Sequence, residues 1–393
     1  MITLQSAENA LKNVYLGLVA NQINIASDPL LAQIKHSTNH IYGKEIRKAA
    51  PIGINGGIGA GDEDGALPTP SGTDYAQFTA ELKNLYGTIQ ITDKALRATS
   101  NNVNSFVNLL NDEMENLIKS SNFNLGRMLY GDGSGKLGEL DSMLEAKYTL
   151  NMASGINNFI EGMVIEYETC PGYYYKVLYV DVANKQIVVD KNNFTAAKMN
   201  AGDYFFLKGS LNKEITGIEG IFSNTSLYGL TKADNKWLNP YVNSETVYLS
   251  DAEIQKVIDH LEDHTNSNIN YIATSKPTRR LYQEYLGAYR RNIDVTELKG
   301  GFKTITYNGI PVVGDRFIPE GVMYFLNTDD FTLYEMCDWK WLEDEQGRIL
   351  KQVPNYAAYS ATLVKYAELV CDRPGGQGKL AKIATTLTAP SGS

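Results

Sequence analysis

Cysteine is scarce in this sequence, with three residues among 393. Cys170, Cys337 and Cys371 are odd in number and far apart, which argues against a disulfide framework and a metal site. Such cysteines are typical of reduced, buried thiols in a cytoplasmic compartment.

Histidine is also scarce, and the four histidines form two pairs at i, i+4 spacing: His36 with His40, and His260 with His264. Two imidazoles at this spacing on a helix can share a metal ion. No third ligand follows at a matching spacing, and His260–His264 departs from the zinc-protease pattern because Leu261 follows the first histidine. The pattern favours a polar helix flank, and we expect no metal site.

Positive charge is in deficit, with 36 basic against 45 acidic residues. The basic stripe of a nucleic-acid reader is therefore missing. No apolar run approaches the roughly 18 residues of a membrane span, and residues 1–20 lack the pattern of a secretory signal. A hydrophobic fraction of 43% indicates a globular protein, long enough for two or three domains.

Catalytic motifs are missing as well. Neither a G-x-S-x-G elbow nor a Cys-His signature occurs, and the neighbouring acids Glu113 and Glu115 have no nucleophile beside them. Residues 53–61 are rich in glycine but lack the lysine and hydroxyl residue of a phosphate-binding loop. Residues 133–138 match G-x-G-x-x-G but follow a predicted helix, so they indicate a turn. We expect no catalytic residues and no cofactor.

The most regular element is a predicted helix over residues 103–130. Its apolar residues recur every three or four positions, which places them on one face. Asn101 and Asn102 can cap its start, and glycines 131, 133 and 135 end it. At about 1.5 Å per residue the helix is about 40 Å long, the dimension of a strut.

The segments before this helix predict an arm and a long loop. Residues 10–20 have helical spacing, but the first 50 residues hold too little apolar material for their own core. Residues 51–70 are polar and glycine-rich, and residues 75–92 have strand character. A long excursion between strand-like flanks predicts an extended hairpin, and loops of this length usually have a function or form an interface.

The segments after the helix predict strands and then a mixed region. Short aromatic and β-branched runs near residues 163–168, 173–180, 186–190 and 204–207 predict a small antiparallel sheet or barrel. Helices are predicted over 250–265 and 277–289, and a hairpin turns at Asn308-Gly309. Residues 356–371 predict a long strand, after which Pro374-Gly375-Gly376 is expected to end the ordered region.

The order and spacing of several segments resemble those of the major capsid proteins of tailed bacteriophages, with the Hong Kong 97-type fold. The resemblance runs from about residue 40 to residue 380. The residues that carry it are Asn55, Gly56, Gly57, Gly59, Gly61, Leu67 and Pro68 in the glycine-rich loop; Leu85, Tyr86, Gly87 and Ile91 after it; Arg127, Gly131, Asp132 and Gly133 at the end of the long helix; Gly309, Asp315, Arg316 and Pro319 downstream; and the final strand before Cys371. The resemblance also implies that Phe106, Leu110 and Leu117 belong to the spine helix.

The resemblance implies an α+β fold with seven parts. They are an N-terminal arm (1–45), an extended loop over a neighbouring subunit (46–92), a peripheral domain with its spine helix (93–136), an inserted β-rich domain (137–246), an axial domain (247–345), a strand returning to the peripheral domain (346–380) and a flexible tail (381–393). The β-rich part is larger than the simplest members of the fold require.

The resemblance also implies a function: hexamers and pentamers that form an icosahedral shell around double-stranded DNA, built in the cytoplasm of a host bacterium and retained in the virion. The implied partners are further copies of the chain, a separate scaffolding protein, a portal, a decoration protein and non-specifically contacted DNA, without a membrane. A negative chain suits such a container, because basic walls would bind the packaged polyanion.

Two other interpretations stay open at this point. An encapsulin-like nanocompartment has the same architecture and encloses enzymes in place of DNA. A two-domain enzyme or glycan-binding protein would use the tyrosines of the β-rich segment, which are Tyr173, Tyr174, Tyr175 and Tyr204. Tyrosines on a β-domain are more often core or interface residues, so we favour the shell.

Overall fold

The computed structural model describes residues 29–52, 55–65, 67, 69, 71–94, 103–144, 148–169, 172–191, 199–289, 295–297 and 303–387. The expected arm helix over 10–20, the capping residues Asn101 and Asn102, Pro68, Cys170 and residues 388–393 lie outside these ranges. No helix in the described part of the chain is long and apolar enough to cross a membrane.

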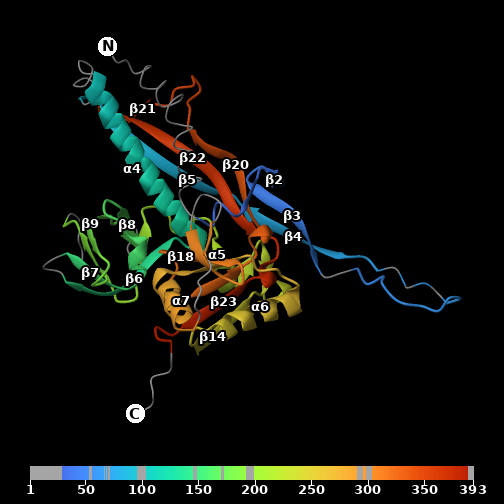
Figure 1. The fold of residues 1–393 in the computed structure, drawn as a ribbon. Helices are drawn as coiled ribbons and strands as arrows, with labels where there is room; N and C mark the ends of the chain where they lie inside the picture. The colour runs from blue at the N-terminus through green and yellow to red at the C-terminus, as the bar shows by residue number, and fades with distance from the viewer. Residues whose placement is uncertain are drawn as a thin grey trace.

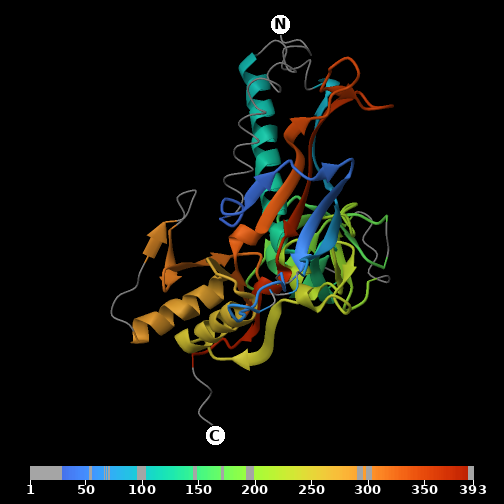
Figure 2. The same cartoon turned by 90° about the vertical axis from the view of Figure 1, so that its right-hand side faces the viewer.

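The predicted long helix is present as α4 (Val103–Tyr130). It lies along a sheet whose longest strand is β22 (Ala358–Cys371). Strand β22 pairs antiparallel with β5 (Lys83–Thr92) on one side and with β20 (Phe331–Trp341) on the other. The short strand β1 (Lys35–Ser37) pairs parallel to β20, and β21 (Lys351–Gln352) pairs antiparallel to β22. Helix and sheet together form the upright part of the molecule in Figure 2.

Close packing between α4 and β5 depends on Gly87. A Cβ atom at this position would lie 2.7 Å from the Cδ1 atom of Leu117, whose side chain is buried. We predict that Gly87→Ala lowers the free energy of unfolding by about 1–2 kcal/mol through overpacking. In urea denaturation the double variant Gly87→Ala/Leu117→Val should recover part of this loss, whereas Thr88→Ala, on the exposed side of β5, should cost little. Equal losses in the single and double variants would contradict this contact.

The extended loop is a hairpin of β3 (Glu45–Ile52) and β4 (Asp74–Glu81), with β2 (Ile41–Tyr42) pairing at its base. It projects well beyond the body of the protein (Figure 1). The sequence placed residues 46–92 in this loop, but residues 83–92 form β5 and pair with β22. Their alternating buried and exposed side chains suit a sheet with one covered face, so the loop ends about ten residues earlier than predicted.

The β-rich segment is a closed barrel of six strands in the order β10-β7-β6-β11-β8-β9. The predicted strands are β8 (Val164–Tyr167), β9 (Tyr175–Asp181), β10 (Gln186–Val189) and β11 (Tyr204–Leu207). Two unpredicted strands, β6 (Lys136–Leu144) and β7 (Thr149–Ser154), close it, followed by the short helix η3 (Ile156–Asn158). Closure buries one separate apolar core inside the barrel.

The barrel is shorter than the predicted 137–246 domain. After β11 the chain returns to the main body through α5 (Ile218–Ser223), β12 (Ser226–Leu227), β13 (Leu230–Thr231) and η5 (Lys236–Leu238). Ile215, Ile218 and Leu227 are buried in the same core as α4 and β22. The inserted domain therefore ends near Leu207, because the apolar residues beyond it pack elsewhere.

The expected axial region is a seven-stranded sheet in the order β14-β23-β19-β15-β18-β17-β16. Its strands are β14 (Tyr241–Val247), β15 (Tyr271–Ser275), β16 (Val295–Glu297), β17 (Lys303–Tyr307), β18 (Ile310–Asp315), β19 (Met323–Leu326) and β23 (Gly378–Ile383). The predicted helices are α6 (Asp251–Thr265), capped by the Ser250 hydroxyl, and α7 (Lys276–Tyr289). Side chains of α6, α7 and the sheet share one core.

Two boundaries of this region differ from the prediction. Residues 331–341, expected in the axial domain, form β20 and pair with β22 after the short helix η6 (Thr328–Asp330). Residues 381–383, expected in a flexible tail, end β23, which pairs with β14 and β19. The glycines that suggested an end of order belong to η7 (Pro374–Gly376), where a Cβ on Gly375 would lie 2.5 Å from the carbonyl oxygen of Trp237.

Candidate functional site

The far end of the β3–β4 hairpin carries the first group of predicted site residues. Asn55, Gly56, Gly59, Gly61 and Leu67 are exposed and Gly57 is half-buried, whereas Pro68 lies outside the described residues. The Asn55 side-chain oxygen accepts a hydrogen bond from the Gly57 N–H at 2.8 Å, which fixes a local turn. The side chains of Ile58, Leu67 and Tyr75 are 83%, 90% and 66% exposed. Three exposed apolar side chains on a projecting hairpin make it a candidate contact surface.

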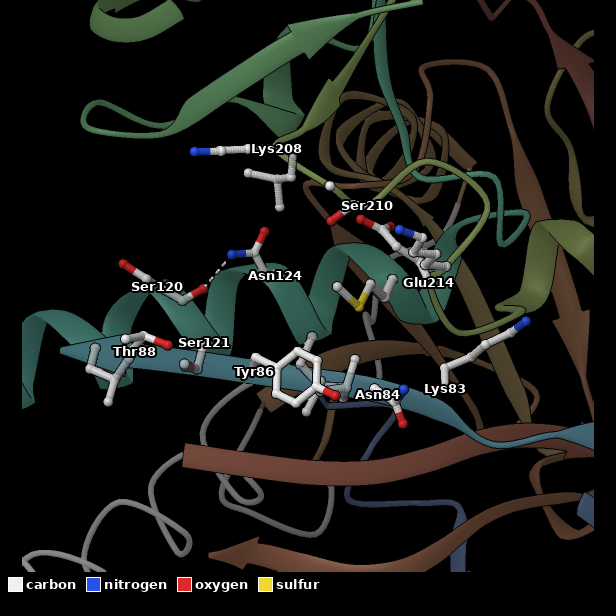
Figure 3. Close-up of a pocket in the computed structure, with 18 of the residues that line it drawn as sticks. Lys83, Asn84, Tyr86, Thr88, Ser120, Ser121, Asn124, Lys208, Ser210 and Glu214 are labelled. Atoms are coloured by element: carbon white, nitrogen blue, oxygen red, sulfur yellow. Dashed lines mark hydrogen bonds between the residues drawn. The ribbon is translucent and has the colours of Figure 1, made fainter. Parts of the chain in front are cut away.

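A large open pocket of about 770 Å³, which we call the spine groove, lies between β5, α4 and residues 207–214 (Figure 3). Tyr86 and Thr88 contribute from β5, and Ser120 and Asn124 from α4. Asn124 donates to the Ser120 carbonyl at 3.0 Å, and its Oδ1 atom is buried without a partner among the described residues. The Trp339 Nε1–H, also in the lining, is likewise unpartnered within the described part of the chain.

One wall of the spine groove is an open sheet edge. Strand β5 pairs with β22 along one side only, and none of the other described strands pairs with its second side. An open edge presents backbone N–H and C=O groups that another extended chain can pair with. The groove therefore offers both backbone and side-chain hydrogen-bonding groups to a polypeptide.

The end of the spine helix carries the second group. Asp132 accepts hydrogen bonds from the Ser134 N–H at 2.9 Å and from its hydroxyl, and Gly133 has φ +87°. A Cβ atom on Gly133 would lie 3.2 Å from the Thr216 hydroxyl oxygen. Gly131 accepts from the Gly220 N–H at 3.3 Å. The glycine-rich sequence thus forms the packed end of α4, as expected. For Phe106 and Leu110 the structure describes only the backbone of α4.

Arg127 forms a buried ion pair that the sequence alone did not show. Its Nη2 lies 2.6 Å from Oε1 of Glu214, and both side chains are 4% exposed. Glu214 belongs to the segment that returns from the barrel, so the pair joins this segment to the last turns of α4. Removing one partner of such a pair leaves an uncompensated charge in a dry interior.

The predicted site residues of the axial region do not form one cluster; each makes separate contacts. Gly309 (φ +84°) is in the β17–β18 turn, and Pro319 is exposed. Asp315 accepts from the Phe317 N–H at 2.8 Å. The Arg316 guanidinium lies 4.7 Å from the ring centre of Phe123 on α4, and it donates to the Asn157 carbonyl at 3.0 Å. Arg316 therefore connects the axial sheet, the spine helix and the barrel.

Two buried charges on β22 were missed by the sequence analysis. The Lys365 ammonium is fully buried and lies 2.6 Å from Glu335 and 3.2 Å from Asp338. Glu368 is 2% exposed, and burial raises its pKa to about 8, against the opposing effects of the Thr216 N–H and the Lys83 charge. The sequence does carry a signal for both residues, because Lys365 and Glu368 are charged residues within a predicted strand of mostly apolar residues.

The histidines and tyrosines are placed in ordinary structural contacts. His260 and His264 stack with ring centres 4.1 Å apart, and burial together with the His264 charge lowers the pKa of His260. Among the described residues no three metal-ligating side chains cluster. Tyr175 is fully buried and stacks on Tyr167 inside the barrel, so the four tyrosines do not share one exposed platform.

Sequence comparisons give no relatives: no protein-family model matches the chain, and no curated protein matches it. Solved structures do match. A chain of the cyanophage A-1(L) capsid is 13% identical, with 94% of each chain covered and a TM-score of 0.55. A chain of the satellite phage P4 procapsid is 12% identical, covering 93% of this chain and 99% of that one, with a TM-score of 0.44. An encapsulin from Synechococcus elongatus PCC 7942 is 9% identical, covering 92% and 89%, with a TM-score of 0.44.

The cyanophage match covers nearly the whole of both chains, so it concerns the complete architecture and not one domain. The predicted α+β, Hong Kong 97-like fold is therefore confirmed: this chain has the fold of a phage capsid subunit.

Proposed function

We propose that this chain is the major capsid protein of a tailed bacteriophage and assembles into an icosahedral shell. The observation that carries the proposal is the projecting β3–β4 hairpin, whose apolar side chains Ile58, Leu67 and Tyr75 are exposed in the described part of the chain. Ordering such a hairpin costs conformational entropy. We therefore infer that the surface of a neighbouring copy supplies the contacts that offset this cost. The role is structural, and no step of chemistry is required.

The spine groove of a neighbouring copy is a surface of suitable chemistry for the hairpin end. Lys208 and Lys213 stand on one wall of the groove and oppose the acidic residues 62–64 of the hairpin in charge. Leu117 and Leu125 line the groove that Ile58 would enter, and the glycines beside Ile58 allow a close backbone approach. Each copy both gives a hairpin and receives one, and repetition of this contact around a shell adds avidity.

Disulfide trapping tests the proposal. Particles of the double variant Ile58→Cys/Ser120→Cys should form covalent dimers and higher multimers after mild oxidation. Each single variant and the pair Ile58→Cys/Glu262→Cys, with its second cysteine on the exposed side of α6, should remain monomeric on denaturing gels. A chain that never associates, by size-exclusion chromatography and negative-stain microscopy, would contradict the proposed function. Shells without trapping would contradict only the groove as the receiving surface.

The implied partners belong to the same proposal. We propose hexamers and pentamers of the chain around double-stranded DNA, with a portal, a decoration protein and a separate scaffolding protein, assembled in the host bacterial cytoplasm and retained in the virion. Uniform closed shells from the chain expressed alone would argue against the need for a scaffold. DNA in purified native particles would distinguish a phage head from an enzyme-filled nanocompartment.

A further inference from the structure

The root of the β3–β4 hairpin is held by the segment that returns from the barrel. The Thr79 N–H donates to the Tyr228 carbonyl at 2.9 Å. Phe78, 1% exposed, stacks parallel to Trp237 at 5.8 Å between ring centres and lies 5.0 Å from the Tyr228 ring. The direction of the hairpin therefore depends on how residues 216–237 sit against the end of β4.

Glu368 lies at this junction. Its Oε1 accepts a hydrogen bond from the Thr216 N–H at 2.8 Å, while Oε2 is buried and has no partner among the described residues. The carboxyl borders a pocket of about 120 Å³ that is also lined by Thr79, Glu81 and Ser226. One side of this pocket is thus the hairpin root, and the other is the returning segment.

The charged and titratable groups that face the carboxyl come from three elements. Lys83 on β5 and Glu81 on β4 line the pocket, and Tyr228 belongs to the returning segment. Glu81 is exposed and lies 3.5 Å from Lys44. Burial raises the pKa of Tyr228 well above its ordinary value, so the phenol stays neutral near neutral pH. Lys83 is the nearby cation that favours ionised Glu368.

We propose that the proton on Glu368 keeps the hairpin root closed, and that its loss in mildly alkaline solution loosens the contact between β4 and residues 216–228. A neutral carboxyl is tolerated in this enclosed junction, whereas burial disfavours a carboxylate there more than the hydrogen bonds from Thr216 and Leu369 favour it. Opening the root admits water to the charge. The effect on shell formation rests on the function proposed above, but the opening itself is a property of the single subunit.

The direction of the pH dependence follows from linkage. The closed root holds the Glu368 proton up to a pKa of about 8, whereas an open, hydrated root releases it near the ordinary glutamate value. Closure is therefore most favoured below the ordinary glutamate pKa; it weakens as pH rises from there and stops weakening above about pH 8, where the closed root has also lost the proton. The opening constant should increase about tenfold between pH 7 and pH 9.

Hydrogen–deuterium exchange of the full-length subunit tests this proposal. After correction for the intrinsic pH dependence of exchange, protection in peptides covering residues 74–83 and 216–228 should fall about tenfold between pH 7 and pH 9. Glu368→Gln, which cannot ionise, should abolish this fall, and Glu81→Gln should retain it. Constant protection in the wild-type chain, an equal fall in Glu368→Gln, or loss of the fall in Glu81→Gln would overturn the proposal.

A second variant keeps the test decisive if Glu368→Gln does not fold. Lys83→Met removes the cation that favours the carboxylate, so the pH at which the fall in protection levels off should move upward. An unchanged levelling pH would overturn the proposal. None of these measurements requires assembly. Failure of the proposed Glu368 effect and failure of the proposed capsid function are therefore separate outcomes.

Discussion

A chain in which residues 53–73 are replaced by the dipeptide Asn-Gly is expected to fold normally and to form no shells. Ile52 and Asp74 are the last paired residues of β3 and β4, so a two-residue turn can join them without changing the register. The exposed residues at the far end contribute little burial to the single subunit. The urea midpoint should therefore stay close to that of the wild-type chain.

Loss of assembly is the large effect of this deletion. If the hairpin end supplies about 2 kcal/mol at each contact, as the central residues of interfaces do, its removal weakens every contact about thirtyfold. Negative-stain microscopy and size-exclusion chromatography should then show subunits in place of particles. A matched variant with full hairpin length, Ile58→Ser/Leu67→Ser, separates the apolar contact from the reach of the hairpin. Wild-type particle yields from the deletion would contradict the proposed role of the hairpin.

Arg127→Ala is expected to destabilise the subunit by about 3–5 kcal/mol, because it leaves the buried Glu214 carboxylate without its counter-ion. Such a loss is a large fraction of the stability of an ordinary domain. It should appear as a lower urea midpoint of the full chain, with assembly declining as a consequence.

A double variant tests whether the two side chains act as a pair. The double variant Arg127→Met/Glu214→Met removes both charges and should be more stable than Arg127→Ala near neutral pH. Equal losses in both variants at every pH would show that the two side chains are not coupled.

The strongly periodic elements were predictable from the sequence. Residues 103–130 and 250–265 have long amphipathic spacing, and α4 and α6 were predicted almost to the residue. Strand pairing between distant segments was not predictable, because alternation gives the buried face of a strand but not its neighbour. Residues 83–92 could be assigned to the loop, and residues 381–383 to a tail, without violating any local pattern.

The predicted site residues also divide into those set by local sequence and those set by contacts between distant segments. The exposed glycine-rich end of the hairpin and the end of α4 follow from local chemistry, so they were found. Arg316 was identified, but its contacts with Phe123 and Asn157 arise from three separate parts of the chain. Glu368 and Lys365 were missed because their importance depends on burial, which only the assembled sheet creates. Charged residues inside alternating apolar strands are the pattern to examine in similar sequences.

The position of β23 has a consequence for the order in which the chain can fold. This strand lies between β14 and β19, so residues 378–383 have to arrive before residues 241–247 gain a neighbour in the sheet. During synthesis the barrel can form early because its core is separate, whereas the axial sheet stays incomplete until one of the last described segments is made. Under the proposed function, a nascent chain therefore lacks a finished axial surface for association while residues 378–383 are still to be translated.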